Sequence, residues 1–121
     1  MSRIRSSGTA GRGAPHWWMQ RLSALVLAPV VLWLVLSLAT IATLDHATVT
    51  TWIASPTNAM LLAALVLVVC FHMALGLQVI IEDYVHVPRA AAMGILAVRA
   101  GSGLVAVVSI GAVLKIAMGA D

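Results

Sequence analysis

His72 lies inside an otherwise apolar stretch, residues 59–81, which is followed by two acidic residues and Tyr84. A histidine in hydrocarbon is energetically expensive and is more often functional than structural. On a helix, Gly76 lies about 40° and Asp83 about 20° around the axis from His72, and Asp83 is about 16 Å further along. An imidazole, a gap without a side chain and a carboxylate therefore share one helix face.

Two interpretations of His72 follow from the residues alone. The first is a histidine hydrogen-bonded to a neighbouring helix, and the second is an axial ligand of haem, because a low dielectric keeps the imidazole neutral and able to bind iron. Gly76, one turn away, leaves room for a flat macrocycle, although glycine in membrane helices also serves packing. The other histidines fall in the predicted tail and loops, so a second haem ligand would come from another chain; they are His16, His46 and His86.

Asp83 and Tyr84 also allow two interpretations. They are either an ordinary helix end with an interfacial tyrosine or a site for a quinone headgroup. In such a site the tyrosine hydroxyl donates a hydrogen bond to a quinone carbonyl, and a carboxylate holds the tyrosine or relays protons. Arg21 could pair with an anionic group such as a haem propionate, or could only set the orientation of the chain.

The composition requires a membrane. Of 121 residues, 62% are hydrophobic and 9% are charged, and the mean hydropathy is +1.06. A soluble domain of this size does not need so much apolar surface. The net charge of +3 is concentrated before the first apolar run, which indicates membrane orientation and argues against nucleic-acid binding. Cys70 cannot form an internal disulfide and is interpreted as a small hydrophobic residue.

These patterns predict an all-α integral membrane protein with three transmembrane helices. We expect a flexible basic tail over residues 1–15 and one membrane domain over residues 16–121. Residues 45–58 and 82–89 read as loops, and Pro29 is expected to kink the first helix. The third crossing is expected to start near residue 98, after a helical lead-in. With lead-ins included, the predicted helices cover approximately residues 19–44, 58–83 and 90–118.

The distribution of arginines predicts one orientation. The tail and the second loop carry arginines, whereas the first loop carries neither Lys nor Arg, so the N-terminus is expected in the cytoplasm and the C-terminus in the periplasm. Arg99 and Lys115 then fall near opposite ends of the third crossing, where long cationic side chains reach the interface. A stripe of small residues on this helix predicts close approach of another helix, within this chain or from a partner membrane subunit: Ser102, Ala106 and Ser109.

The pattern His72-x3-Gly76-x6-Asp83-Tyr84 on the second of three helices resembles the succinate dehydrogenase hydrophobic membrane anchor (D) subunit. The segment Trp17-x2-Gln20-Arg21-x-Ser23-Ala24 is similar to the start of the first helix in alphaproteobacterial members. The resemblance extends over nearly the whole chain, whereas the sequence His86-Val87-Pro88 has no counterpart to which a role can be assigned.

The resemblance implies a non-catalytic anchor in the bacterial inner membrane. His72 would be an axial ligand of haem b, with the other ligand from the cytochrome b556 (C) anchor subunit. Tyr84 would hydrogen-bond ubiquinone, supported by Asp83. Further partners would be the iron–sulfur subunit and the flavoprotein subunit, which oxidise succinate; this chain has neither a flavin-binding fingerprint nor a cysteine cluster. The alternatives are a fumarate reductase anchor using menaquinone and a non-redox structural membrane subunit.

Overall fold

The computed structural model describes residues 7–119, and side-chain surroundings are described for residues 14–119. Four helices follow one another in this range: α1 (Ser7–Ala39), α2 (His46–Ala54), α3 (Pro56–Tyr84) and α4 (Pro88–Ala117). Three segments are long and apolar enough to cross a membrane: Ala14–Ala39, Pro56–Tyr84 and Pro88–Ala117. The prediction of an all-α protein with three spans is confirmed.

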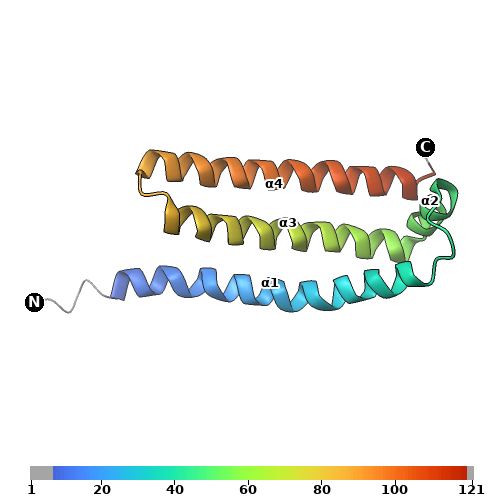
Figure 1. Cartoon of the computed structure of the whole chain (residues 1–121), viewed down its shortest axis with the longest axis horizontal. Helices are drawn as coiled ribbons and strands as arrows, with labels where there is room; N and C mark the ends of the chain where they lie inside the picture. The colour runs from blue at the N-terminus through green and yellow to red at the C-terminus, as the bar shows by residue number, and fades with distance from the viewer. Residues whose placement is uncertain (1–6, 120–121) are drawn as a thin grey trace, which may run out of the picture.

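The three long helices lie in a row, with α3 between α1 and α4 (Figure 1). Helix α3 packs on both neighbours, whereas α1 and α4 make no contact with each other in the described range. A row of helices buries little surface. Among residues 14–119 no large side chain is fully buried. The buried apolar residues in this range are Ala59, Leu65, Cys70 and Ala106. Much apolar surface therefore faces lipid or a partner.

Helix α1 differs from its predicted limits at both ends. Residues 7–15 are helical, where a flexible tail was predicted, and residues 1–6 of that tail lie outside the described range. The prediction relied on hydrophobic periodicity, which a polar first turn does not have. At the other end the helix stops at Ala39, although the apolar run continues to Leu44. The hydroxyl of Thr40 donates to the carbonyl of Ser37, and this contact competes with continuation of the helix.

The predicted loop over residues 45–58 is wrong, because it contains α2. Asp45 caps this helix and accepts a hydrogen bond from the backbone N–H of Thr48. Pro56 then occupies the first turn of α3, where its missing N–H does no harm. The local signal was an N-capping aspartate at the start of a short polar segment.

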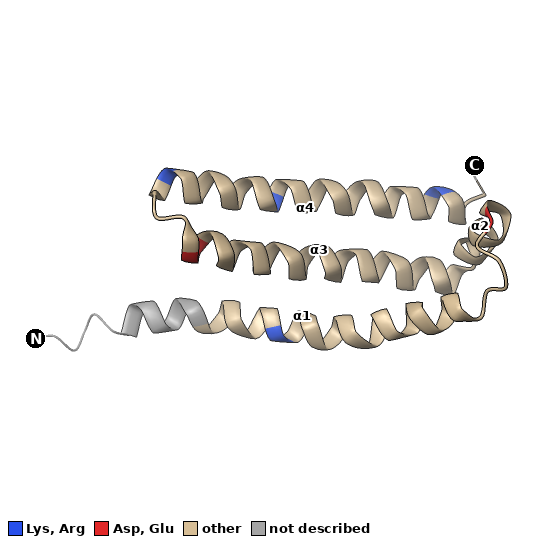
Figure 2. Cartoon of the chain, viewed as in Figure 1, with Lys and Arg blue, Asp and Glu red and all other residues tan. Residues whose placement is uncertain are grey.

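Helix α4 is continuous from Pro88, with no break at residue 98. The connection to α3 is limited to residues 85–87, so the two helices are antiparallel neighbours. Arg99 lies about 16 Å from the beginning of the helix. Its position near one end of the membrane crossing stays a prediction. Arg99 thus lies well inside α4, whereas Lys115 lies in its last turn. Figure 2 shows basic residues along α4 as well as at its ends.

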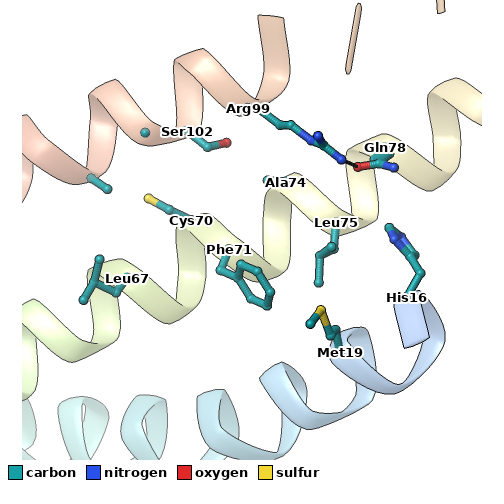
Figure 3. Close-up of a pocket in the computed structure, with 12 residues that line it drawn as sticks. His16, Met19, Leu67, Cys70, Phe71, Ala74, Leu75, Gln78, Arg99 and Ser102 are labelled. Atoms are coloured by element: carbon teal, nitrogen blue, oxygen red, sulfur yellow. Dashed lines mark hydrogen bonds between the residues drawn. The ribbon is translucent and has the colours of Figure 1, made fainter. Parts of the chain in front are cut away.

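Small residues let α3 and α4 approach closely. Ser102 and Ala106 are buried on α4, and in Figure 3 Ser102 lies across from Cys70 of α3. At Gly94 an added Cβ would lie 3.3 Å from Ile81 Cδ1. The predicted small-residue stripe therefore packs, at least in part, within this chain.

Candidate functional site

His72 lies on the flank of α3 that faces α1. Its Nδ1 atom is 2.8 Å from Oγ of Ser23, a residue of α1 with 7% of its surface exposed. The Ser23 hydroxyl also donates to the backbone carbonyl of Gln20 at 2.8 Å. The first interpretation of His72, a hydrogen bond to a neighbouring helix, is thus present in the structure. It leaves Nε2 without a hydrogen-bond partner among the described residues.

Gly76 also faces α1. A Cβ added there would lie 3.5 Å from Nε2 of Gln20, which is ordinary van der Waals contact. The gap that was expected to admit a macrocycle is therefore bordered by the Gln20 amide. Gly76 is a point of close approach between α1 and α3, one turn from His72.

A cavity of about 690 Å³ opens between α1 and α3 beside Gly76. Arg21 lines it, and the guanidinium carbon of Arg21 lies 5.0 Å from the centre of the Trp17 ring. The structure therefore brings two predicted site residues, Gly76 and Arg21, to the same cavity. The remaining lining residues are His16, Trp17, Gln20, Gln78, Val79 and Glu82.

Asp83 and Tyr84 are the last two residues of α3 and are exposed, with 78% of the tyrosine surface accessible. No hydrogen bond links them to each other or to another described side chain. The acidic residue that lines the cavity is the neighbouring Glu82, which accepts a hydrogen bond of 2.8 Å from Gln78. The structure thus adds Glu82 as an acidic group at this end of α3.

Sequence reasoning missed a polar connection between α3 and α4. Arg99 Nη2 donates to Oε1 of Gln78 at 2.9 Å (Figure 3). Gln78 Nε2 in turn donates to Glu82. The signal was present in the sequence, since Gln78 interrupts an apolar span and Glu82 follows four residues later, on the same helix face.

The predicted placement of two histidines is also corrected. His16 belongs to α1, within the segment able to span the membrane, and His46 is the first residue of α2. His16 Nε2 and Gln20 Oε1 are buried without a hydrogen-bond partner. His86 lies in the connection after α3, as expected. Within the described residues no three His, Cys, Asp or Glu side chains gather to hold a metal ion.

Fold and site together define a multi-pass helical membrane protein with a polar seam on its middle helix. Residues 1–114 match the Succinate dehydrogenase/Fumarate reductase transmembrane subunit family, and the chain belongs to this family. The proposed resemblance is confirmed.

Curated relatives lie on the succinate side of the family. The chain is 32% identical over 111 residues to the Succinate dehydrogenase hydrophobic membrane anchor subunit of Rickettsia bellii, covering 92% of this chain and 89% of the relative. It is 32% identical over 84 residues to the protein of the same name from Rickettsia conorii, covering 69% and 67%. The Succinate dehydrogenase membrane anchor subunit of Reclinomonas americana is 32% identical over 90 residues, covering 72% and 75%. No solved structure matches the chain.

Proposed function

We propose that this chain is a membrane anchor of a succinate:quinone oxidoreductase that tethers the flavoprotein and iron–sulfur subunits, shares haem b with a cytochrome b556 partner and contributes to the quinone site. Family membership supports the anchor role. The observation that carries the site is the Ser23–His72 contact, which occupies one ring nitrogen and leaves the other available. The relatives' names favour the succinate over the fumarate direction.

The residues fit a haem shared between two chains. His72 would supply one axial nitrogen, and the second would come from the cytochrome b556 partner. The bound haem would supply a one-electron carrier in contact with both anchors. Arg21 lines the cavity beside Gly76, where its charge suits a propionate.

A quinone would bind near the end of α3. Its reduction to quinol takes two electrons, delivered from the iron–sulfur subunit, and two protons. The exposed Tyr84 hydroxyl is free to donate a hydrogen bond to a quinone carbonyl, and Asp83 would supply or hold protons beside it. We place this end at the cytoplasmic face of a bacterial inner membrane, with the C-terminus in the periplasm, on the basis of the arginines in the tail and at position 89.

The test uses the complete complex, purified with wild-type chain, His72→Ala or Tyr84→Phe, with its subunits identified by mass. We expect His72→Ala to change the reduced-minus-oxidised haem spectrum and to lower the haem content. Tyr84→Phe removes one hydrogen-bond donor and should lower succinate–quinone reductase activity about tenfold. It should leave succinate oxidation with an artificial acceptor intact.

Each assignment has a contrary result. A haem spectrum and content unchanged in His72→Ala would remove the ligand role. Equal loss of both activities in Tyr84→Phe would indicate misassembly instead of a quinone contact. Absence of flavoprotein and iron–sulfur subunits from the purified wild-type sample would contradict the anchor role itself.

A further inference from the structure

The hydroxyl group of Ser23 links His72 to the backbone of α1. Ser23 Oγ lies 2.8 Å from the carbonyl oxygen of Gln20 and 2.8 Å from Nδ1 of His72. A serine hydroxyl has a single proton but can accept through its lone pairs. We assign that proton to the Gln20 carbonyl, an assignment in which Ser23 accepts from the ring and Nδ1 carries the imidazole proton.

This arrangement leaves Nε2 of the neutral imidazole unprotonated. Metal-binding histidines almost always donate their other ring N–H to an acceptor, which fixes both the tautomer and the orientation of the ring. We propose that Ser23 is a positioning residue that holds His72 in the Nδ1–H tautomer and directs Nε2 towards the haem iron. The inference rests on the proposed function, because it assumes that His72 is a ligand.

Burial makes the contact effective. Ser23 is among the least exposed polar residues described, and hydrogen bonds are stronger where water is excluded. The two residues are 49 positions apart and belong to different helices, so the bond restricts rotation of the ring relative to α1 as well as α3. The ring N–H donates to the hydroxyl and the hydroxyl donates to the carbonyl, and such chains strengthen each bond in turn.

The group that accepts from the His72 ring N–H is the uncharged Ser23 hydroxyl, and its removal is expected to change the spectrum of the haem. A carboxylate acceptor would raise the basicity of the ligand, whereas a hydroxyl leaves the imidazole close to its ordinary neutral form. Removal of the hydroxyl frees the ring to rotate and leaves Nδ1–H without its acceptor. The ferric haem should report both changes in its electron paramagnetic resonance.

The experiment compares Ser23→Ala, Ser23→Thr and Ser37→Ala in the purified complete complex. Ser23→Thr keeps the hydroxyl, and Ser37→Ala is the matched control, since Ser37 lies on the same helix and its hydroxyl makes no described hydrogen bond to α3. We expect Ser23→Ala to shift the g values of the ferric haem and to release haem about tenfold faster than wild type. Ser23→Thr and Ser37→Ala should match wild type in both measurements.

The inference fails if Ser23→Ala has wild-type g values and haem release while His72→Ala still loses the haem signal; the ligand assignment then stands without a positioning residue. If His72→Ala itself leaves the signal unchanged, the proposed function fails at its haem site. Should Ser23→Ala not assemble, Ser23→Cys provides the same comparison, because it preserves size but accepts hydrogen bonds weakly. The same shift would support the inference, and wild-type behaviour would overturn it.

Discussion

The two flanks of α3 are built differently. Towards α4, close packing of small residues predominates, with Gly94 against Ile81 and Ser102 and Ala106 buried. Towards α1, the contacts centre on polar atoms, with Ser23 bonded to His72 and the Gln20 amide beside Gly76.

This difference indicates a division of roles. Close packing and one polar contact, from Arg99 to Gln78, hold the α3–α4 pair together. The α1–α3 seam contains the hydrogen-bonded His72 and two buried polar atoms without partners among the described residues, His16 Nε2 and Gln20 Oε1. Buried polar atoms without a hydrogen-bond partner are uncommon in proteins, and they are consistent with a further group that binds at this seam. Under the proposed function, another group would complete the polar contacts of the α1–α3 seam.

The largest effect is expected from adding a large side chain to each flank. Gly94→Leu should destabilise the purified complex by about 1–3 kcal/mol, because the added side chain overpacks against Ile81. The loss is measured as a lower midpoint of thermal unfolding. Gly76→Leu should instead reduce haem content, since it separates α1 from α3 one turn from His72. Gly101→Leu is the control, because an added Cβ there meets nothing within 4 Å. Equal haem loss in both flank variants would break the proposed division.

A smaller effect is expected at the polar contact of the packing flank. Gln78→Leu deprives Arg99 of its acceptor and Glu82 of its donor, and should destabilise the protein by about 1 kcal/mol in thermal unfolding. In a double-mutant cycle, Arg99→Leu should cost less when Gln78 is already replaced. Strictly additive effects of the two substitutions would show that the contact contributes nothing to stability.

The smallest effect is expected at α2, a short helix that is not one of the three spans and that packs against α3 and α4. Hydrogen bonds from the hydroxyls of Thr48 and Thr43 lower the pKa of Asp45 from 3.8 to about 2. Because the folded pKa is the lower one, this stabilisation is present above pH 3.8 and is lost as the pH falls towards 2. Asp45→Asn should remove that pH dependence from the local stability of α2. Hydrogen exchange of the α2 backbone amides, measured as a function of pH, checks this. An identical acid response in Asp45→Asn would refute the assignment.

Several features were predictable because they depend on local sequence. The apolar runs identified three spans, and the spacing of His72 and Gly76 placed both on one face, which proves to be the face towards α1. The limits of α1 and the presence of α2 were not predicted correctly. The start of α2 depends on the capping contact at Asp45, and α1 begins in a polar segment. A hydropathy pattern indicates neither of these boundaries.

The sequence by itself determined that this protein crosses a membrane three times and carries one histidine in the middle of its central helix, because span length and helix periodicity follow from rise and rotation per residue. The tertiary structure alone decided that Ser23 meets His72, that Gln20 borders Gly76 and that Arg99 meets Gln78. These contacts join residues on different helices. They depend on which flanks pack together and how the helices are rotated, which no local pattern specifies.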